Sequence, residues 1–172
     1  MFWEFSVAVY SLDCVSTSVL NLQNTYGVDV NLLLLCCFAA KRQVQLTVAD
    51  LRCAENKIGD WRSTVTVPLR SIRNRLTEDH VFKPLCDVSE IRRSVLGAEV
   101  TSEKVTQSLL EEFFETITVR YVVSGEVEFE RLALENLSNY LEVLNILMSR
   151  EIRDHLEILI HASSTVDIEG GR

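Results

Sequence analysis

Residues 30–40 read Val30-Asn31-Leu32-Leu33-Leu34-Leu35-Cys36-Cys37-Phe38-Ala39-Ala40, the most hydrophobic run in this chain of 172 residues. A helix of this sequence is apolar on every side, which is typical of a helix buried at the centre of a fold. The run is too short to cross a bilayer, which takes about 18–20 apolar residues. Asp29 stands before it as a candidate N-cap. We therefore expect an all-α fold, a compact bundle of about five to seven helices around a buried helix at residues 30–40.

The segment before this run also has a helical pattern. Apolar residues recur at intervals of three and four between residues 15 and 26. Asp13 precedes this segment as a candidate N-cap, and Gly27 follows it at the place of a left-handed C-terminal residue. The pattern predicts a helix that ends just before the buried one begins.

The segment after the run repeats the same spacing over residues 51–76, behind a candidate capping box at Thr47 and Asp50. Pro68 lies inside this stretch and has no N–H to donate to Thr64. The phase of the apolar residues continues across the proline. One kinked helix and two collinear helices are both compatible with this pattern.

Two further helical patterns occupy the C-terminal half. A stripe over residues 88–113 is interrupted by Ser102, and a longer stripe runs over residues 129–159, where Ser149 is a candidate start for a separate final helix. The first stripe consists of Val88, Ile91, Val95, Ala98, Val105, Leu109 and Phe113. Residues 116–123 are rich in β-branched side chains but have no evident second strand to pair with, so they are expected to be frayed helix or loop.

Composition narrows the class of protein. Only two prolines and six glycines are present, which favours long helices over the many turns of an all-β fold. We expect one helical domain over residues 1–165 and a loose tail over residues 166–172.

The net charge of −8 disfavours nucleic acid as a partner, and no run is long enough for a membrane span. The five cysteines include no C-x-x-C pair and indicate reduced thiols in a cytoplasmic protein.

The sequence contains no motif for catalysis, a cofactor or a metal. Nucleophile motifs such as G-x-S-x-G, phosphate-binding glycine loops and the H-E-x-x-H zinc motif are all absent. We therefore assign no catalytic residue, no cofactor and no metal ligand. These absences favour a protein that is not an enzyme, although a missing motif does not exclude one.

Arginines provide the only candidate ligand site. On a helical wheel of residues 51–76, Arg52, Arg62, Arg70 and Arg73 gather along one edge of the apolar stripe. Such an edge either clamps a carboxylate or phosphate through paired N–H donors, or pairs with acidic residues of the same chain. Residues 76–172 carry nineteen acidic and nine basic side chains, so partners for the second alternative are abundant.

Three blocks of the sequence resemble an uncharacterised proteobacterial family, a domain of unknown function. The first block runs from Trp3 to Tyr10 and continues through Leu22-Gln23 to Tyr26-Gly27-Val28-Asp29-Val30-Asn31-Leu32-Leu33-Leu34. The second is Trp61-Arg62 followed by Val67-Pro68-Leu69-Arg70 and Arg73, and the third is Glu135-Asn136-Leu137-Ser138-Asn139-Tyr140-Leu141. The resemblance implies a compact helical protein of the bacterial cytosol and implies no activity, cofactor or catalytic residue.

Two functions are compatible with these observations. The first is a helical adaptor or regulatory protein that binds another protein, with a homodimer through the C-terminal helix as a further expectation. The alternative is a small-molecule or anion-binding protein, which could be an enzyme, that uses Arg62, Arg70 and Arg73 with Tyr10 and Asn31. In the alternative, Tyr10 and Asn31 supply polar groups to a pocket, whereas otherwise they satisfy backbone groups at a helix junction.

Overall fold

The computed structural model describes residues 1–78, 88–118 and 128–167. Of these residues 84% are helical and none lies in a strand, which confirms the all-α fold. The elements are α1 (Phe2–Tyr10), α2 (Val15–Tyr26), α3 (Val30–Lys41), α4 (Val48–Trp61), the π-helical turn η1 (Arg62–Thr66), α5 (Val67–Glu78), α6 (Val88–Thr118), α7 (Phe129–Val143) and α8 (Arg150–Thr165). Because α4, η1 and α5 follow one another without a break, the described chain forms seven separate helical rods.

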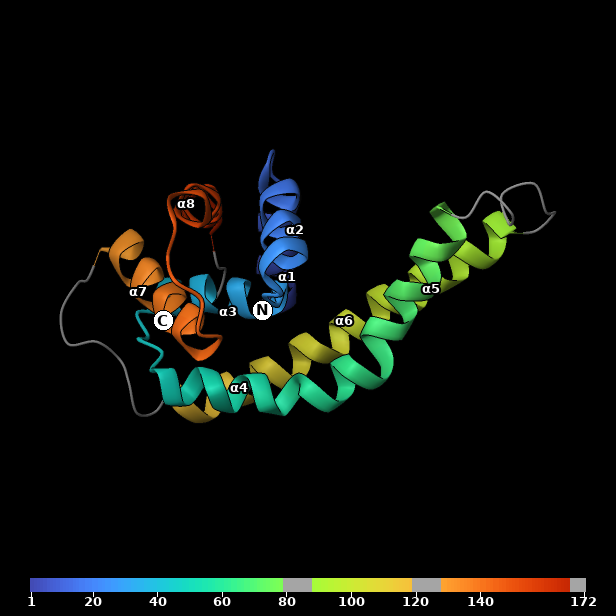
Figure 1. Cartoon of the computed structure of the whole chain (residues 1–172). Helices are drawn as coiled ribbons and strands as arrows, with labels where there is room; N and C mark the ends of the chain where they lie inside the picture. Colours follow the sequence, from blue (N-terminus) through green and yellow to red (C-terminus); the bar gives the residue numbers. More distant parts are fainter. Residues whose placement is uncertain (79–87, 119–127, 168–172) are drawn as a thin grey trace.

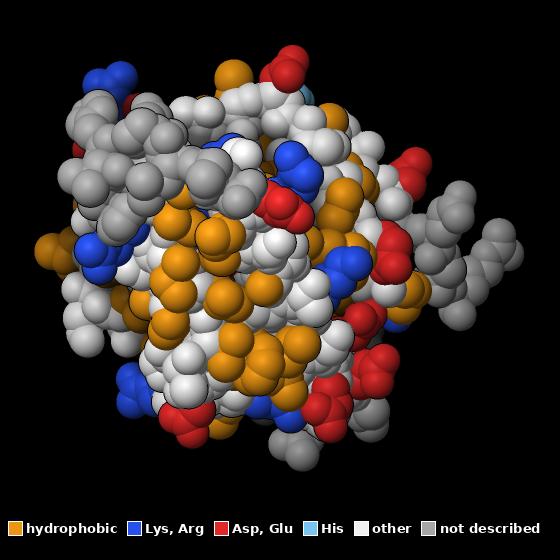
Figure 2. Space-filling view, turned by 90° about the vertical axis from the view of Figure 1, so that its right-hand side faces the viewer, with side chains coloured by type: hydrophobic (Ala, Val, Ile, Leu, Met, Phe, Trp, Pro, Cys, Tyr) orange, Lys and Arg blue, Asp and Glu red, His pale blue; other side chains and the backbone are white. Residues whose placement is uncertain are grey.

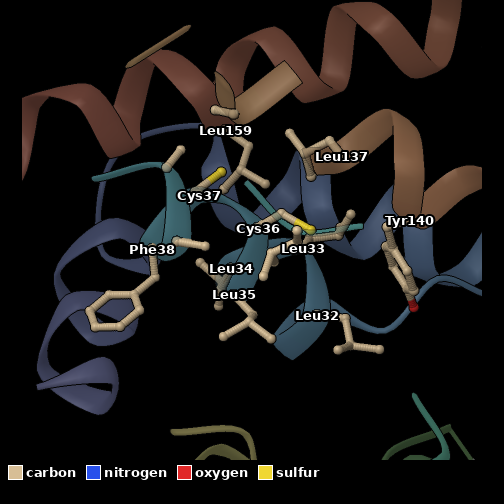
Figure 3. Packing of buried hydrophobic residues seen from close by; sticks show 14 of the residues in the cluster. Leu32, Leu33, Leu34, Leu35, Cys36, Cys37, Phe38, Leu137, Tyr140 and Leu159 are labelled. Carbon is tan, nitrogen blue, oxygen red and sulfur yellow. The ribbon is translucent and has the colours of Figure 1, made fainter. Parts of the chain in front are cut away.

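The apolar run forms α3, and it lies at the centre of the bundle as expected. Every residue from Asn31 to Ala40 is buried. Helix α3 packs most extensively on α7, and it also contacts α1, α6 and α8 (Figure 1). Figure 3 shows the side chains of α3 beside Leu137 and Tyr140 of α7 and beneath Leu159 of α8. This burial on all sides confirms that residues 30–40 form the buried helix.

Aromatic rings fasten the C-terminal half of α3 to its neighbours. The Phe38 ring lies with its centroid 5.2 Å from that of Phe2, 5.5 Å from Phe5 and 5.4 Å from Phe114. Tilted and edge-on rings at these distances attract one another beyond their burial of area. Helices α1 and α6 are therefore joined to α3 through one shared ring.

The helix ends largely follow the capping signals in the sequence. Asp29 and Ser149 cap α3 and α8 through their side chains, and Thr47 and Asp50 form the complete capping box of α4. Gly27 has a φ of 72° and ends α2, a left-handed conformation that glycine adopts without steric cost. The break at Ser149 makes α7 and α8 two helices.

The expected N-cap of α2 is wrong. Cys14 precedes α2 with a φ of 65°, and no side chain caps the helix. Asp13 is exposed in the turn between α1 and α2 instead. The chain turns from α1 to α2 within residues 11–14. The left-handed Cys14 occupies the N-cap position itself, so Asp13 lies one residue too early to cap α2.

Pro68 is the second residue after the π-helical turn. The Val67 N–H donates to the Arg62 carbonyl, five residues back, which is the wider π-type hydrogen bond. A proline cannot donate to the carbonyl four residues earlier, and its ring pushes that carbonyl away. The extra residue in η1 gives room for this displacement, so α4 continues into α5 with a bend.

Helix α5 and the first part of α6 extend away from the bundle as a two-helix projection (Figure 1). We call α5 together with residues 88–98 of α6 the arm. Within the described side chains of the arm, none is buried. Leu69, Leu76, Val88 and Val95 are half-buried, whereas Ile72 and Ile91 are exposed.

Helix α6 turns a different face inward from the one that its apolar stripe predicts. Its buried residues are Glu99, Ser102, Thr106, Gln107, Leu110, Phe114 and Ile117. The stripe of Val88 to Phe113 is at most half-buried, because only α5 covers its first part and the inward face meets polar groups of α3, α4 and η1. Residues 116–118 belong to α6, and residues 119–123 lie outside the described residues.

Within the described ranges, no single helix combines the length and hydropathy that a membrane span requires. Helices α1 and α2 reach that length and composition only as a pair, and the pair is bent by 100°.

Candidate functional site

The five residues of the candidate ligand site lie around one junction between helices. Arg62 opens η1, Arg70 and Arg73 lie on α5, Asn31 begins α3 and Tyr10 ends α1. All of them face the middle of α6 or the start of α3. The structure therefore brings the predicted residues together, and the partners described below decide what they do there.

Arg70 and Arg73 bind glutamates of α6. The Arg70 Nε donates to Glu99 Oε1 at 3.1 Å, and its Nη2 donates to Glu103 Oε1 at 2.6 Å. Arg73 Nε donates to Glu99 Oε2 at 2.5 Å. Glu99 is buried, so its charge depends on these two guanidinium groups. The pairs hold α5 against α6 at the base of the arm.

Arg62 binds carboxylates of two other elements. Its Nη1 donates to Asp29 Oδ2 at 3.2 Å, and its Nη2 donates to Glu55 Oε1. Asp29 also accepts the Asn31 N–H at 2.8 Å as the cap of α3. The hydrogen bond with Glu55 raises the pKa of Arg62 further above its usual value. Arg62 therefore joins the end of α4 to the start of the central helix.

Asn31 connects these two groups of ion pairs. Its Nδ2 donates to Glu103 Oε2 at 2.6 Å, and its Oδ1 accepts from Gln107 Nε2 at 2.9 Å. Both partners lie on the inward face of α6. The side chain of Asn31 thus takes part in a buried hydrogen-bond chain rather than standing open to a ligand.

Tyr10 lies at the edge of this junction. Its side chain is 36% exposed, and partial burial raises the pKa of its phenol. Arg70 and Arg73 lie close enough to lower that pKa, while Glu99 and Glu103 raise it. Trp3 lies earlier on α1, and the centre of its ring is 4.9 Å from the Nζ of Lys104 on α6. Helix α1 therefore runs along α6 and places Tyr10 beside the ion pairs.

Trp61 and Thr66 bind the same buried serine of α6. Trp61 Nε1 donates to Ser102 Oγ at 3.1 Å, and Thr66 Oγ1 lies 2.6 Å from the same oxygen. Trp61 is half-buried, and its indole N–H is hydrogen-bonded. These contacts bracket η1 and fix the bend of the α4–η1–α5 helix.

We call this set of contacts the arginine network. It contains the cations Arg62, Arg70 and Arg73 and the anions Asp29, Glu55, Glu99 and Glu103. Four carboxylates outnumber three guanidiniums, so the network is net acidic. An incoming anion would have to displace carboxylates that already occupy the guanidinium donors, and leaving Glu99 or Asp29 buried and unpaired is costly. The arrangement is suited to fixing the arm on the bundle.

Burial raises the pKa of Glu103 above its usual range, although its bond to Asn31 opposes this shift. A carboxyl whose pKa is raised by folding stabilises the protein below its unfolded pKa and loses that contribution as pH rises. We expect the unfolding free energy of wild type, minus that of Glu103→Gln, to fall as the pH rises above the usual glutamate pKa of about 4.3. Urea unfolding of both proteins at a series of pH values measures the difference. A difference that rises with pH would show that Arg70 dominates instead.

Four residues of α6 that belong to the arginine network or contact its members were not predicted as site residues: Glu99, Ser102, Glu103 and Gln107. Ser102 could have been found from the sequence, because it is a polar residue that interrupts the apolar stripe of its helix. Glu99, Glu103 and Gln107 follow one another at intervals of four, which puts them on one helix face. Such a polar face is usually solvated, and only its contact with α3 and α5 makes it a site.

A second feature is a pocket of about 600 Å³ between the turn that joins α1 to α2 and the outer face of α8. Its walls combine apolar and acidic side chains, with Leu12 and Asp13 from the turn and Asp154, Glu157 and Ile158 from α8 among them. None of the predicted ligand residues lines this pocket. Within the described part of the chain, no group of three or more His, Cys, Asp and Glu side chains is arranged to hold a metal ion.

These features define an all-α protein whose polar centre is an ion-pair network. The chain belongs to the family described as protein of unknown function (DUF2390), whose model matches residues 1–110. The match includes Tyr10, Asn31 and the three arginines and ends within α6. It confirms the resemblance to an uncharacterised family, while the block at residues 135–141 lies beyond the matched part. No curated protein and no solved structure matches the chain.

Proposed function

We propose that this protein works by binding another protein and that the arm is its binding surface. The observation that carries the proposal is the exposure of apolar side chains on the arm and at its base. Five of the twelve large hydrophobic side chains that are exposed in the described chain lie between residues 67 and 100. They are Val67, Ile72, Ile91, Leu96 and Val100. Concentrated apolar exposure of this kind marks interaction surfaces.

Two helices alone cannot cover each other's apolar stripes. Figure 2, which looks at the molecule from the side toward which the arm extends, shows hydrophobic side chains gathered across the middle of that face. A further element laid along the arm would bury its exposed side chains Ile72, Ile91 and Leu96, as an added helix does in a bundle. The arm therefore has the form of an incomplete helical bundle that a partner completes.

The arginine network supports this proposal because it holds the arm in place. Arg70 and Arg73 tie α5 to α6, and Ser102 ties η1 to α6. A surface that is already ordered loses less conformational entropy when it binds. The same pairing disfavours the anion-binding alternative, since the guanidinium donors are in use.

The charges on the arm indicate what its partner looks like. Among the described side chains of the arm, the exposed basic residues are Arg75, Arg92 and Arg93, and the exposed acidic residue is Glu90. The exposed charge of the arm is therefore net positive. A matching partner presents apolar side chains flanked by carboxylates. We place this binding in a bacterial cytoplasm, which the free thiols of Cys14, Cys36, Cys37 and Cys53 support.

A photo-crosslinking residue at position 91 or 96 tests the proposal in cells of the native host. We expect both positions to trap the same protein, and position 108, which is exposed on α6 outside the arm, to trap none. The purified partner should then bind Leu96→Asp at least about tenfold more weakly than wild type.

Leu20→Asp is the matched control, because Leu20 is similarly exposed on α2. It should leave the affinity unchanged. Equal trapping at positions 91, 96 and 108, or equal loss of affinity in the two aspartate variants, would contradict the arm as the binding surface.

A further inference from the structure

The pocket beside α8 has the chemistry that the arm requires of a partner. Leu12 and Ile158 are partly exposed on its walls. Asp13, Asp154 and Glu157 surround these apolar side chains with carboxylates. The pocket is therefore an apolar patch with an acidic rim, and the arm is an apolar surface with a basic rim.

The acidic residues of the pocket are available for an incoming cation. None of Asp13, Asp154 and Glu157 forms an ion pair with the described residues. On the arm, Arg75 and Arg93 likewise form no ion pair with any described carboxylate, and Arg92 contacts only the Thr77 hydroxyl there, at 3.5 Å. Each surface thus carries charges that the described part of its own chain leaves uncompensated.

The distribution of charge along the chain agrees with this complementarity. Residues 67–100 carry six basic and five acidic side chains, whereas the whole chain has a net charge of −8. The arm region is thus slightly cationic and the remainder strongly anionic. Contacts between two arms or between two α8 pockets would place like charges together, which opposes association. Contact between an arm and a pocket places opposite charges together.

We propose that the partner of the arm is a second copy of this chain, which receives the arm on its α8 pocket. This inference rests on the proposed function and specifies its partner. The arm leaves the bundle beside α4, whereas the pocket lies at the turn between α1 and α2 on the other side of α3 (Figure 1), so an arm reaches the pocket of a neighbour rather than its own. The C-terminal helix then takes part in self-association, but against an arm instead of another α8.

An arm-to-pocket contact joins two different surfaces, so a pair joined by one such contact still offers one free arm and one free pocket. Such head-to-tail contacts either close into a ring or grow with concentration. Because the rim contacts are between exposed charges, salt weakens them. Assembly beyond a monomer that depends on both concentration and salt is therefore the expected behaviour.

Sedimentation velocity of the purified chain from about 1 µM to about 100 µM tests the inference. We expect the mass at low salt to rise above the 19.6 kDa of one chain and to fall back at high salt. The arm variant Arg92→Glu/Arg93→Glu and the pocket variant Asp154→Lys/Glu157→Lys should each remain monomeric. An equal mixture of the two should associate again, because each reversed surface then meets its reversed complement.

Arg52→Glu/Arg131→Glu is the matched control, since it makes the same change in charge at exposed sites outside both surfaces. It should associate as wild type does. A monomeric wild type, or a mixture that fails to associate, would overturn the inference. If wild type stays monomeric while position 91 traps a different protein, the proposed function stands and only its assignment to a second copy fails. If position 91 traps nothing, both fail.

Discussion

Leu34→Ala should lower the free energy of unfolding by about 2–5 kcal/mol. Leu34 lies in the middle of α3 with 2% of its surface exposed, and neighbours surround it on every side. Removal of the isobutyl group leaves a cavity that close-packed helices cannot collapse to fill, so both the lost burial and the lost packing contribute. Urea unfolding monitored by circular dichroism at 222 nm measures the change.

Leu20→Ala provides the comparison for this prediction. Leu20 lies on α2 and is 40% exposed, so the same chemical change there should cost less than about 1 kcal/mol. A loss of similar size in the two variants would mean that α3 is not the centre of the core. The pair separates burial from any general effect of replacing leucine by alanine in a helix.

The central helix was predictable because its signal is local. A run that is apolar on every side has to be enclosed, whatever encloses it. The caps at Asp29, Thr47 and Ser149 were predictable for the same reason, since a cap joins residues only two or three positions apart. The predicted cap at Asp13 was wrong because Cys14, in a left-handed conformation, occupies the N-cap position of α2.

The face of α6 was not predictable because it depends on distant partners. Glu99, Glu103 and Gln107 are buried or half-buried by contacts with α3 and α5, and these contacts join residues at least 26 positions apart. A pattern rule ranks such residues as solvent-facing and ranks Val95 or Leu109 as core. The arginines could be named from the sequence, whereas their carboxylate partners required the register of α5 against α6.

The arm shows a further limit of periodicity. Its apolar spacing is that of helices that pack on a core, so nothing in the pattern indicated that α5 and residues 88–98 lie apart from the bundle. The stripes are present, but only one helix covers each of them. The arm therefore has more apolar side chains than its two helices can cover. This excess makes its surface a candidate for binding a partner.

Asn136 of α7 is the residue whose structural role the sequence indicated least. It is fully buried, and its side chain makes three hydrogen bonds to the backbone. Its Oδ1 accepts the Leu46 N–H at 2.8 Å, and its Nδ2 donates to the carbonyls of Cys36 and Val44 at 3.1 Å each. One side chain therefore makes hydrogen bonds to the backbone of α3 and to the backbone of the segment that connects α3 to α4.

Asn136→Ala should lower the free energy of unfolding by at least about 2 kcal/mol, since it takes away the side-chain partner of the Leu46 N–H and of the Val44 carbonyl, at about 1–3 kcal/mol each. The Cys36 carbonyl also loses this bond but lies within α3, where the helix supplies its backbone partner. Asn136→Leu should be no better, because leucine restores the volume but none of the hydrogen bonds. Ser138→Ala, on the exposed face of the same helix, should change stability by less than about 0.5 kcal/mol. Urea unfolding of the four proteins decides the matter. Recovery of stability in Asn136→Leu would mean that packing, rather than the pairing of the segment before α4, is what Asn136 supplies.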